Sequence, residues 1–145
     1  MTHTIGEVIP VLEGHWGQGY YYCPTGPQEG GFCVMGAIAE AWHHDAEKAD
    51  WLYNLTLDEL WRHIDATDID VDLDEIKAER EVVKRLAQFL TERAPEGPEH
   101  DEMEANISMG LWHDAIVYWN DDVASTEEEV IEALQAFAEQ EKSRT

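Results

Sequence analysis

Hydrophobic side chains recur at helical spacing in three long segments of the chain. They repeat every three or four residues within residues 56–64, 74–93 and 126–138. Thr56 and Thr126 each precede a glutamate by three residues, which is the capping-box pattern of a helix N-terminus. The pattern therefore predicts an amphipathic helix over each of these segments.

Two further segments have shorter helical patterns. Residues 4–14 predict a short helix that starts near Thr4 and stops near Gly14, although Pro10 weakens any helix beyond its first turn. Residues 33–43 have an apolar stripe made mostly of cysteine, glycine and alanine side chains. Small side chains permit close helix contacts, so we expect this second helix to lie near the centre of the fold.

The remaining segments show turn and strand signals. Residues 19–33 combine the aromatic run GYYYC with the turn-rich run PTGPQEGG, which predicts a small β-hairpin or an irregular ribbon. Residues 111–119 are rich in aromatic and β-branched side chains, a composition that fits either a strand or a buried helix. Residues 94–101 contain two prolines and predict a mobile surface loop.

Together these patterns predict one domain over residues 1–145. The hydrophobic content of 43% and the six tryptophans are sufficient for a core. We expect a mainly helical (α+β) fold with about four main helices around that core. A small β-hairpin element is expected from residues 19–33, with residues 111–119 as a candidate addition to it.

The charge of the chain is strongly negative. It has 32 acidic residues against 9 lysines and arginines, for a formal net charge of -23. Such a charge repels phosphate backbones and anionic lipids, so we expect neither direct nucleic-acid binding nor membrane binding. A basic protein partner is compatible with it. Residues 101–145 have twelve acidic residues against only Lys142 and Arg144, and so produce the strongest negative field.

The cysteines and the N-terminus indicate the compartment. Nothing at the N-terminus reads as a basic segment followed by an apolar signal core, and no apolar run approaches the roughly 20 residues that span a bilayer. Two cysteines do not make the dense framework of a small secreted protein. We therefore expect a cytoplasmic protein with reduced thiols, and a disulfide between Cys23 and Cys33 is the alternative.

Acidic residues alternate with hydrophobic ones before the 74–93 segment. The acidic positions are Asp68, Asp70, Asp72 and Asp74. Glu79 stands where a twelve-residue calcium loop needs its last ligand, but the sixth position, which needs glycine, is Leu73, and the eighth is Glu75 instead of an apolar residue. The alternation instead predicts an extended segment with one buried face.

Histidine does not suggest a metal site either. His43, His44 and Asp45 are adjacent, and neighbours in sequence point in different directions from a helix end instead of converging on one ion. We therefore expect surface histidines or hydrogen-bonded core histidines, and we predict no metal and no cofactor.

Cys33 raises the question of nucleophilic catalysis, because it lies where a helix is predicted to begin. A helix N-terminus stabilises a thiolate, and His113 with Asn120 or Asp121 would then act as base and orienting group, with Gln18 as an oxyanion donor. His113 and Asn120 are only seven residues apart, unlike their counterparts in papain-like hydrolases. A hydrolase that uses Cys33, His113 and Asn120 is therefore the alternative, and we predict no catalytic residues.

Three motifs together are more specific than any one of them. HWGQG, CVMGAIAEA and YWNDDVASTEEEVIEALQAFA resemble an uncharacterised domain family of actinobacteria and their bacteriophages. The shared pattern is Trp-x-Gln-Gly, Cys-x-x-Gly-Ala and Trp-Asn-Asp-x4-Thr-x-x-Glu-Val, and it leaves residues 45–105 unmatched. The resemblance implies no activity. It implies a serine-like residue at Cys33 in some relatives, and a loop at Asn120 and Asp121 that orients the final helix.

These observations lead to a functional prediction. We expect a small acidic non-enzymatic binding protein, encoded by a phage, that engages a basic host protein. In the most specific form of this prediction, the partner binds nucleic acid and the protein acts on it as a DNA mimic or inhibitor. A homo-oligomer with a structural task is the other open possibility. The predicted binding residues are Asp68, Asp70, Asp72, Asp74, Glu127, Glu128 and Glu132.

Overall fold

The computed structural model describes residues 3–24, 29–67 and 71–144, and these residues are mainly helical. The elements, in chain order, are η1 (Ile5–Glu7), α1 (Ile9–Leu12), α2 (Val34–His43), η2 (Ala46–Lys48), α3 (Ala49–Leu52), α4 (Leu57–Thr67), α5 (Leu73–Arg93), α6 (Pro98–Ser108), α7 (Trp112–Tyr118), η3 (Trp119–Val123) and α8 (Glu127–Lys142). Within these residues no helix is both long enough and apolar enough to cross a bilayer.

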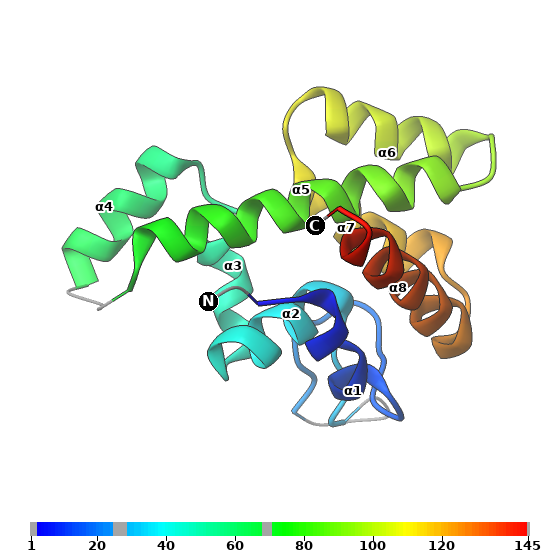
Figure 1. The fold of residues 1–145 in the computed structure, drawn as a ribbon, viewed down its shortest axis with the longest axis horizontal. Coiled ribbons are helices and arrows are strands. Elements are labelled where there is room, and N and C mark those ends of the chain that lie inside the picture. The colour runs from blue at the N-terminus through cyan, green and yellow to red at the C-terminus, as the bar shows by residue number, and fades with distance from the viewer. Residues whose placement is uncertain (1–2, 25–28, 68–70, 145) are drawn as a thin grey trace.

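The long helix α5 runs across the molecule (Figure 1). The helices α4 and α6 lie along opposite halves of it, and α1, α2 and α8 lie on its other side in this view. The helix α7 packs against both α5 and α6, and α8 packs against η1 and α1. The N-terminal and C-terminal helices are therefore neighbours in space.

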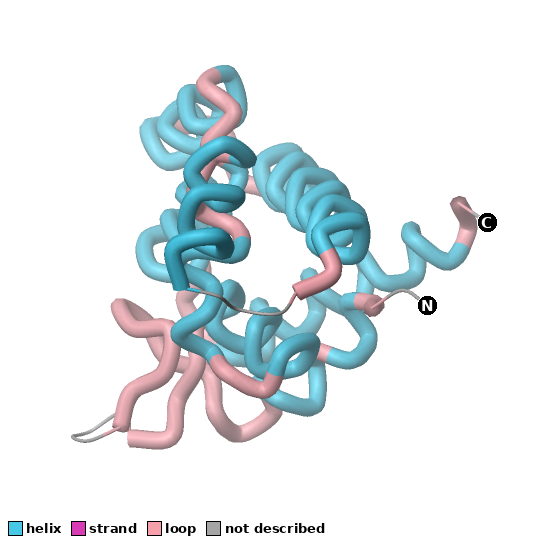
Figure 2. The backbone as a smooth tube through the Cα atoms, turned by 90° about the vertical axis from the view of Figure 1, so that its left-hand side faces the viewer, coloured by secondary structure: helices cyan, strands magenta, loops and turns pink. Residues whose placement is uncertain are grey.

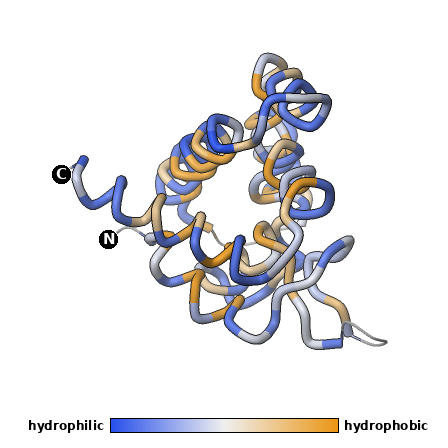
Figure 3. The backbone as a smooth tube through the Cα atoms, turned by 90° about the vertical axis from the view of Figure 1, so that its right-hand side faces the viewer, coloured by the Kyte–Doolittle hydropathy of each residue, from blue (hydrophilic) through white to orange (hydrophobic). Residues whose placement is uncertain are grey.

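The core is centred on α2, as the stripe of small residues predicted. Five of its ten residues are fully buried: Val34, Met35, Ala37, Ile38 and Ala39. The other helices contribute larger side chains, among them Leu86 and Leu90 of α5 and Phe137 of α8, all with no exposed surface. Figure 3 shows hydrophobic and hydrophilic positions alternating around these helices. Burial of one face of each helix is the main stabilising contribution.

The helices that hydrophobic periodicity predicted are confirmed within a few residues at each end. The predicted ranges 56–64, 74–93 and 126–138 correspond to α4, α5 and α8. The predicted caps are also present, because Thr56 and Thr126 each accept a hydrogen bond from the backbone N–H three residues later. The predicted helix near residues 4–14 is divided into η1 and α1, with Pro10 in the first turn of α1.

The predicted β-hairpin over residues 19–33 is wrong. The described residues form no strand, and this region contains two isolated bridges, from Phe32 to Trp16 and to Tyr22. Gly19 and Gly30 adopt φ values of 87° and 82°, which turn the chain out of an extended conformation. The described parts of this segment, residues 19–24 and 29–33, therefore form a looped ribbon beside the helices (Figure 2).

Three further expectations are corrected. The chain has eight α-helices in its described part instead of about four. Residues 111–119 make no β addition and take the helical alternative, because Trp112–Tyr118 form α7, Leu111 is its N-cap and Trp119 is the first residue of η3. The expected loop over 94–101 is interrupted by α6, because Pro98 occupies the first turn of that helix, where proline needs no backbone N–H partner.

Candidate functional site

Cys33 is the N-cap residue of α2. Its Sγ accepts a hydrogen bond from the backbone N–H of Gly36 at 3.3 Å. The side chain is 4% exposed, and burial raises the pKa of the thiol to about 11. A thiol with this pKa is almost fully protonated at neutral pH and is a poor nucleophile. In the described part of the chain no disulfide joins it to Cys23.

Gly36 explains the small side chains at the start of α2. A Cβ atom built on it would lie 1.9 Å from the carbonyl oxygen of Tyr21. Real Cβ atoms do not approach so closely, and the neighbour is backbone that cannot swing away. Glycine at this position therefore permits the looped ribbon to pack directly on the helix.

Asn120 connects three distant parts of the chain. Its Oδ1 accepts hydrogen bonds from the indole Nε1 of Trp16 at 2.8 Å and from the backbone N–H of Val34 at 3.0 Å. Its Nδ2 donates to the carbonyl of Gly17 and to the side chain of Asp121. Because Val34 is the first residue of α2, this side chain satisfies a helix N–H that has no partner within the helix.

Gln18 and Asp121 complete the same connection. The side-chain amide of Gln18 donates to the carbonyls of Asn120, Asp121 and Ala124 over 3.0–3.2 Å. The carboxylate of Asp121 accepts from the backbone N–H of Gly19 at 3.0 Å. The residues that the hydrolase alternative assigns to an oxyanion donor and an orienting group are therefore engaged in hydrogen bonds that hold loops together.

Glu127 belongs to this network as well. Its carboxylate accepts hydrogen bonds from the backbone N–H groups of Gly14 at 2.8 Å and Trp16 at 3.2 Å. The first turn of α8 is thereby attached to the loop that follows α1. Glu127, predicted to bind a partner, lies half-buried within the fold.

His113, the proposed base, has other partners. It lies buried in α7, its Nε2 is 2.8 Å from the hydroxyl of Tyr21, and its Nδ1 is 3.2 Å from the carboxylate of Asp114. Burial lowers the pKa of this imidazole, against the opposite effects of Asp114 and Asp50. Burial likewise raises the pKa of the Tyr21 phenol, and the nearby carboxylate of Asp50 adds to that shift.

A second polar cluster lies between the N-terminal segment and α5. Its centre is Glu79, a carboxylate with 3% of its surface exposed. Glu79 Oε1 lies 2.8 Å from the hydroxyl of Tyr53 and 2.7 Å from Nε2 of His43. His3 Nε2 lies 3.1 Å from Glu75 Oε1 and 3.8 Å from Glu79 Oε2. Burial, together with the adjacent Glu79 carboxylate, raises the pKa of Tyr53.

With this geometry described, the relationship of the chain to known proteins can be stated. Residues 3–140 match a family described as a family of unknown function, DUF6197. The chain belongs to DUF6197. No curated protein and no solved structure matches it.

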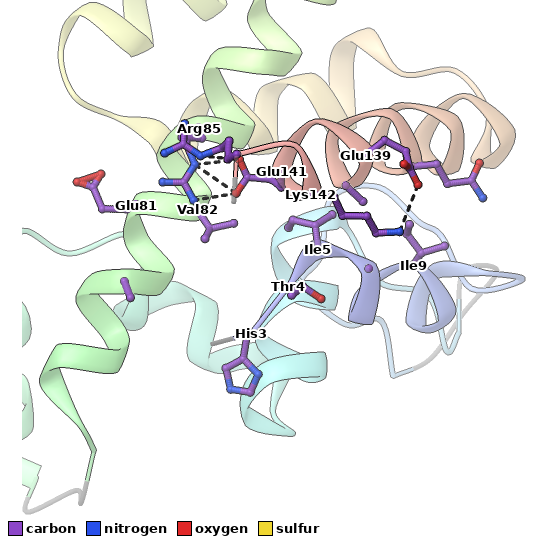
Figure 4. Close-up of a pocket in the computed structure, with 15 residues that line it drawn as sticks. His3, Thr4, Ile5, Ile9, Glu81, Val82, Arg85, Glu139, Glu141 and Lys142 are labelled. Carbon is purple, nitrogen blue, oxygen red and sulfur yellow. Dashed lines mark hydrogen bonds and ion pairs between the residues drawn. The ribbon is translucent and has the colours of Figure 1, made fainter. Parts of the chain in front are cut away.

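This DUF6197 domain has a cavity of about 670 Å³ bounded by η1, α1, α5 and α8. Ile5, Ile9 and Val82 line its apolar part. Arg85 and Glu141 close one side through hydrogen bonds of 2.7–3.2 Å (Figure 4). His3 contributes to the lining, although its ring points away from the Arg85–Glu141 pair toward the neighbouring helix (Figure 4).

The acidic surface of the DUF6197 domain includes a patch between α6 and η3. Burial raises the pKa of Tyr118, and the carboxylates of Asp122, Glu99 and Glu102 raise it further. These three carboxylates are exposed, and they come from two elements. We call Glu99, Glu102 and Asp122 the Tyr118 patch.

The acidic residues predicted to bind a partner have different positions. Asp68 and Asp70 lie outside the described residues. Asp72 is the N-cap of α5 and accepts hydrogen bonds from the N–H groups of Asp74 and Glu75, so the helix begins where the calcium-loop alternative would need a loop. Asp74, Glu128 and Glu132 are exposed. The described members of the predicted set therefore belong to the start of α5 and the first two turns of α8, and their role in binding stays a prediction.

The reasoning from sequence missed the cluster around Glu79. One signal was present, because Glu75 and Glu79 are four residues apart in a segment predicted to be helical and so share a face. His3 and His43 reach them from residues 36 or more positions away, and no spacing rule connects these segments.

Proposed function

We propose that this DUF6197 domain is a small non-enzymatic binding protein whose acidic surface engages a basic protein, one that ordinarily binds nucleic acid. The observation that carries the proposal is the Tyr118 patch, in which three exposed carboxylates from α6 and η3 all act electrostatically on one phenol and raise its pKa. A net charge of -23 reinforces the field of this patch.

Mimicry of DNA is the specific form of this proposal. A duplex presents rows of negative charge, and exposed carboxylates on helices can present a comparable field to a protein that binds phosphates. The sequence from residue 94 to residue 141 contains no lysine or arginine, so within α6, η3 and α8 the first of these basic residues is Lys142, at the end of α8. A negatively charged surface of this kind increases the rate of association with a basic partner and makes the affinity for that partner sensitive to salt.

The hydrogen bonds of the motif residues favour this function over a cysteine hydrolase. Cys33 is a buried cap with a raised pKa, and His113 contacts Tyr21 and Asp114. The amides of Gln18 and Asn120 hold loops together. Because these motif residues have structural roles, their presence in the sequence does not require a catalytic role.

We further propose that the domain is encoded by actinobacteria or their phages and acts in the cytoplasm. The three motifs support the first part, since they resemble a family of that origin. The cysteine content supports the second part, since two cysteines do not make the dense disulfide framework of a small secreted protein.

Affinity capture from an actinobacterial lysate tests the proposal. The immobilised protein is washed at low salt, then with competing duplex DNA, then at high salt, and the released proteins are identified by mass spectrometry. We expect one basic nucleic-acid-binding protein, retained at low salt and released by both the competitor and high salt. Light scattering of the purified chain would separately reveal a homo-oligomer.

Matched variants locate the surface. The triple variant Glu99→Gln, Glu102→Gln, Asp122→Asn removes the Tyr118 patch and should abolish retention. A control with the same change in net charge, Glu13→Gln, Glu47→Gln, Asp65→Asn, alters exposed positions elsewhere and should retain the partner. If both variants lost the partner equally, the net charge of the chain, and not the Tyr118 patch, would be responsible for binding. Retention of the partner that changed neither with salt nor with competing DNA would contradict the proposal.

A further inference from the structure

We propose that His3, Glu75 and Glu79 bind one divalent transition-metal ion of the zinc class between the N-terminal segment and α5. Each residue offers one ligand atom, and the three atoms lie within 4.8 Å of one another. This site goes beyond the proposed binding function, because it involves none of the residues of the Tyr118 patch.

The separations of the ligand atoms suit a single small ion. His3 Nε2 is 3.1 Å from Glu75 Oε1 and 3.8 Å from Glu79 Oε2. Zinc is bound at about 2.0–2.2 Å by imidazole nitrogen and carboxylate oxygen, so two ligands of a tetrahedral ion lie roughly 3.4 Å apart. The two separations fall on either side of that value.

The second oxygen of Glu79 points independently to a ligand. Glu79 is 3% exposed, and its Oε2 is buried and has no hydrogen-bond partner among the described residues. A buried carboxylate oxygen needs a donor or a cation, since it has lost its water. Oε2 faces His3 Nε2 at a distance too long for a hydrogen bond, and a cation between these atoms would satisfy both.

The other oxygen of Glu79 is held in place. Oε1 accepts a hydrogen bond from the hydroxyl of Tyr53 at 2.8 Å. His43 Nε2 lies 2.7 Å from the same atom, within hydrogen-bond distance, and donates to it in the tautomer that carries a proton on Nε2. Two donors on Oε1 fix the orientation of the carboxylate and leave Oε2 for the ion, which is how supporting residues orient ligands in metal sites.

The donor set selects the class of metal. One imidazole and two carboxylates suit zinc and its neighbours in the first transition row, whereas calcium takes six to eight oxygens. The Glu75 side chain is 35% exposed, so the site is open to water on that side. Water can therefore supply the fourth ligand, as in zinc sites with three protein ligands.

The site would join segments that are far apart in the sequence. His3 precedes η1, whereas Glu75 and Glu79 belong to the first two turns of α5. In the part of the chain that the structure describes, the imidazole of His3 contacts the carboxylates of Glu75 and Glu79 directly. An ion bound here would attach the start of the described chain to the longest helix and stabilise the folded state in proportion to its occupancy.

The test uses the full-length untagged chain after treatment with a chelator. Zn²⁺ is titrated by calorimetry, and Co²⁺ by visible absorption, in which a tetrahedral site gives intense bands. We expect one equivalent of each ion to bind and Zn²⁺ to displace Co²⁺. Glu75→Gln and His3→Gln should each weaken binding at least about tenfold.

Controls separate this site from weak surface binding. His15→Gln and Glu81→Gln change the same residue types at exposed positions outside the cluster, and binding should be unaffected. Glu75→Gln is the decisive variant because its half-exposed carboxylate can be replaced without burying a new group, and circular dichroism verifies its fold. Absence of saturable binding, or equal affinity in Glu75→Gln, would show that the cluster is only a hydrogen-bonded imidazole–carboxylate pair and overturn the proposal.

Discussion

The indole Nε1 of Trp16 donates a hydrogen bond to Oδ1 of Asn120 over 2.8 Å, across 104 positions of the chain. The same oxygen accepts from the first backbone N–H of α2, and the amide nitrogen donates to the carbonyl of Gly17. One buried side chain therefore connects the looped ribbon, the central helix and the segment before α8.

Asn120→Ala should therefore be strongly destabilising. It leaves the Trp16 indole, the Val34 N–H and the Gly17 carbonyl without their partner, and unpaired buried polar groups cost about 1–3 kcal/mol each. We expect the free energy of unfolding to fall by about 3 kcal/mol or more in urea denaturation. Asn54→Ala, at an exposed position, should change it by less than about 0.5 kcal/mol. Similar values for both variants would contradict the role of Asn120.

Gly36→Ala tests the close contact between α2 and the ribbon. Helix propensity alone predicts that alanine stabilises a helix by about 1 kcal/mol over glycine. The new Cβ would lie 1.9 Å from the Tyr21 carbonyl oxygen, so we expect a loss of about 3 kcal/mol or more, measured by thermal denaturation. Gly6→Ala is the control, since its Cβ would meet only Thr4 Oγ1, at 3.6 Å. A stabilised Gly36→Ala variant would show that the contact is not present in solution.

The reactivity of Cys33 distinguishes a cap from a nucleophile. With a pKa of about 11 and 4% exposure, its thiol should react with iodoacetamide at least about 100-fold more slowly in the folded protein than in denaturant. The rate is measured for each cysteine by mass spectrometry of digested samples. Rapid alkylation near neutral pH that disappears in His113→Ala would instead support the hydrolase alternative.

His113 makes the stability depend on pH. Burial lowers its pKa below the ordinary value of 6.5, so below pH 6.5 the unfolded chain binds a proton that the folded chain does not. This residue thus contributes stability above pH 6.5, and the contribution is lost as the pH falls through the folded pKa. We expect His113→Gln to lose less stability than the unmodified chain between pH 7.5 and pH 5.5. Parallel pH profiles of the two proteins would show that His113 is not the group responsible.

Much of the helical framework could be predicted because its signals are local. The 3.6-residue period located α4, α5 and α8, the Thr-x-x-Glu boxes marked the starts of α4 and α8, and the stripe of small residues located α2. Local signals failed where two conformations share a composition. Aromatic and β-branched residues at 111–119 form α7, because burial against α5 and α6 outweighs strand propensity.

The candidate sites were less predictable, because they depend on contacts between segments that lie far apart in the sequence. Cys33 could be placed at a helix N-terminus from its position alone, but its burial and its raised pKa depend on segments packed over it. Glu127 reads as one more surface acid in the sequence, whereas the structure uses it to hold the backbone near Gly14. Asp72 likewise reads as part of an acidic row and is the cap of α5.

Composition alone establishes the negative charge. Local sequence patterns establish the positions of α4, α5 and α8 and the caps of α4 and α8, since these depend on residues at most a few positions apart. Tertiary structure alone decides that Asn120 lies against Trp16 and that His3 lies against Glu75 and Glu79. These contacts join segments separated by roughly 70 to 100 positions, and they form only when buried apolar faces bring the helices together. The sequence specifies which side chain stands at each position. The contacts between distant side chains that give them a role arise from packing of the helices.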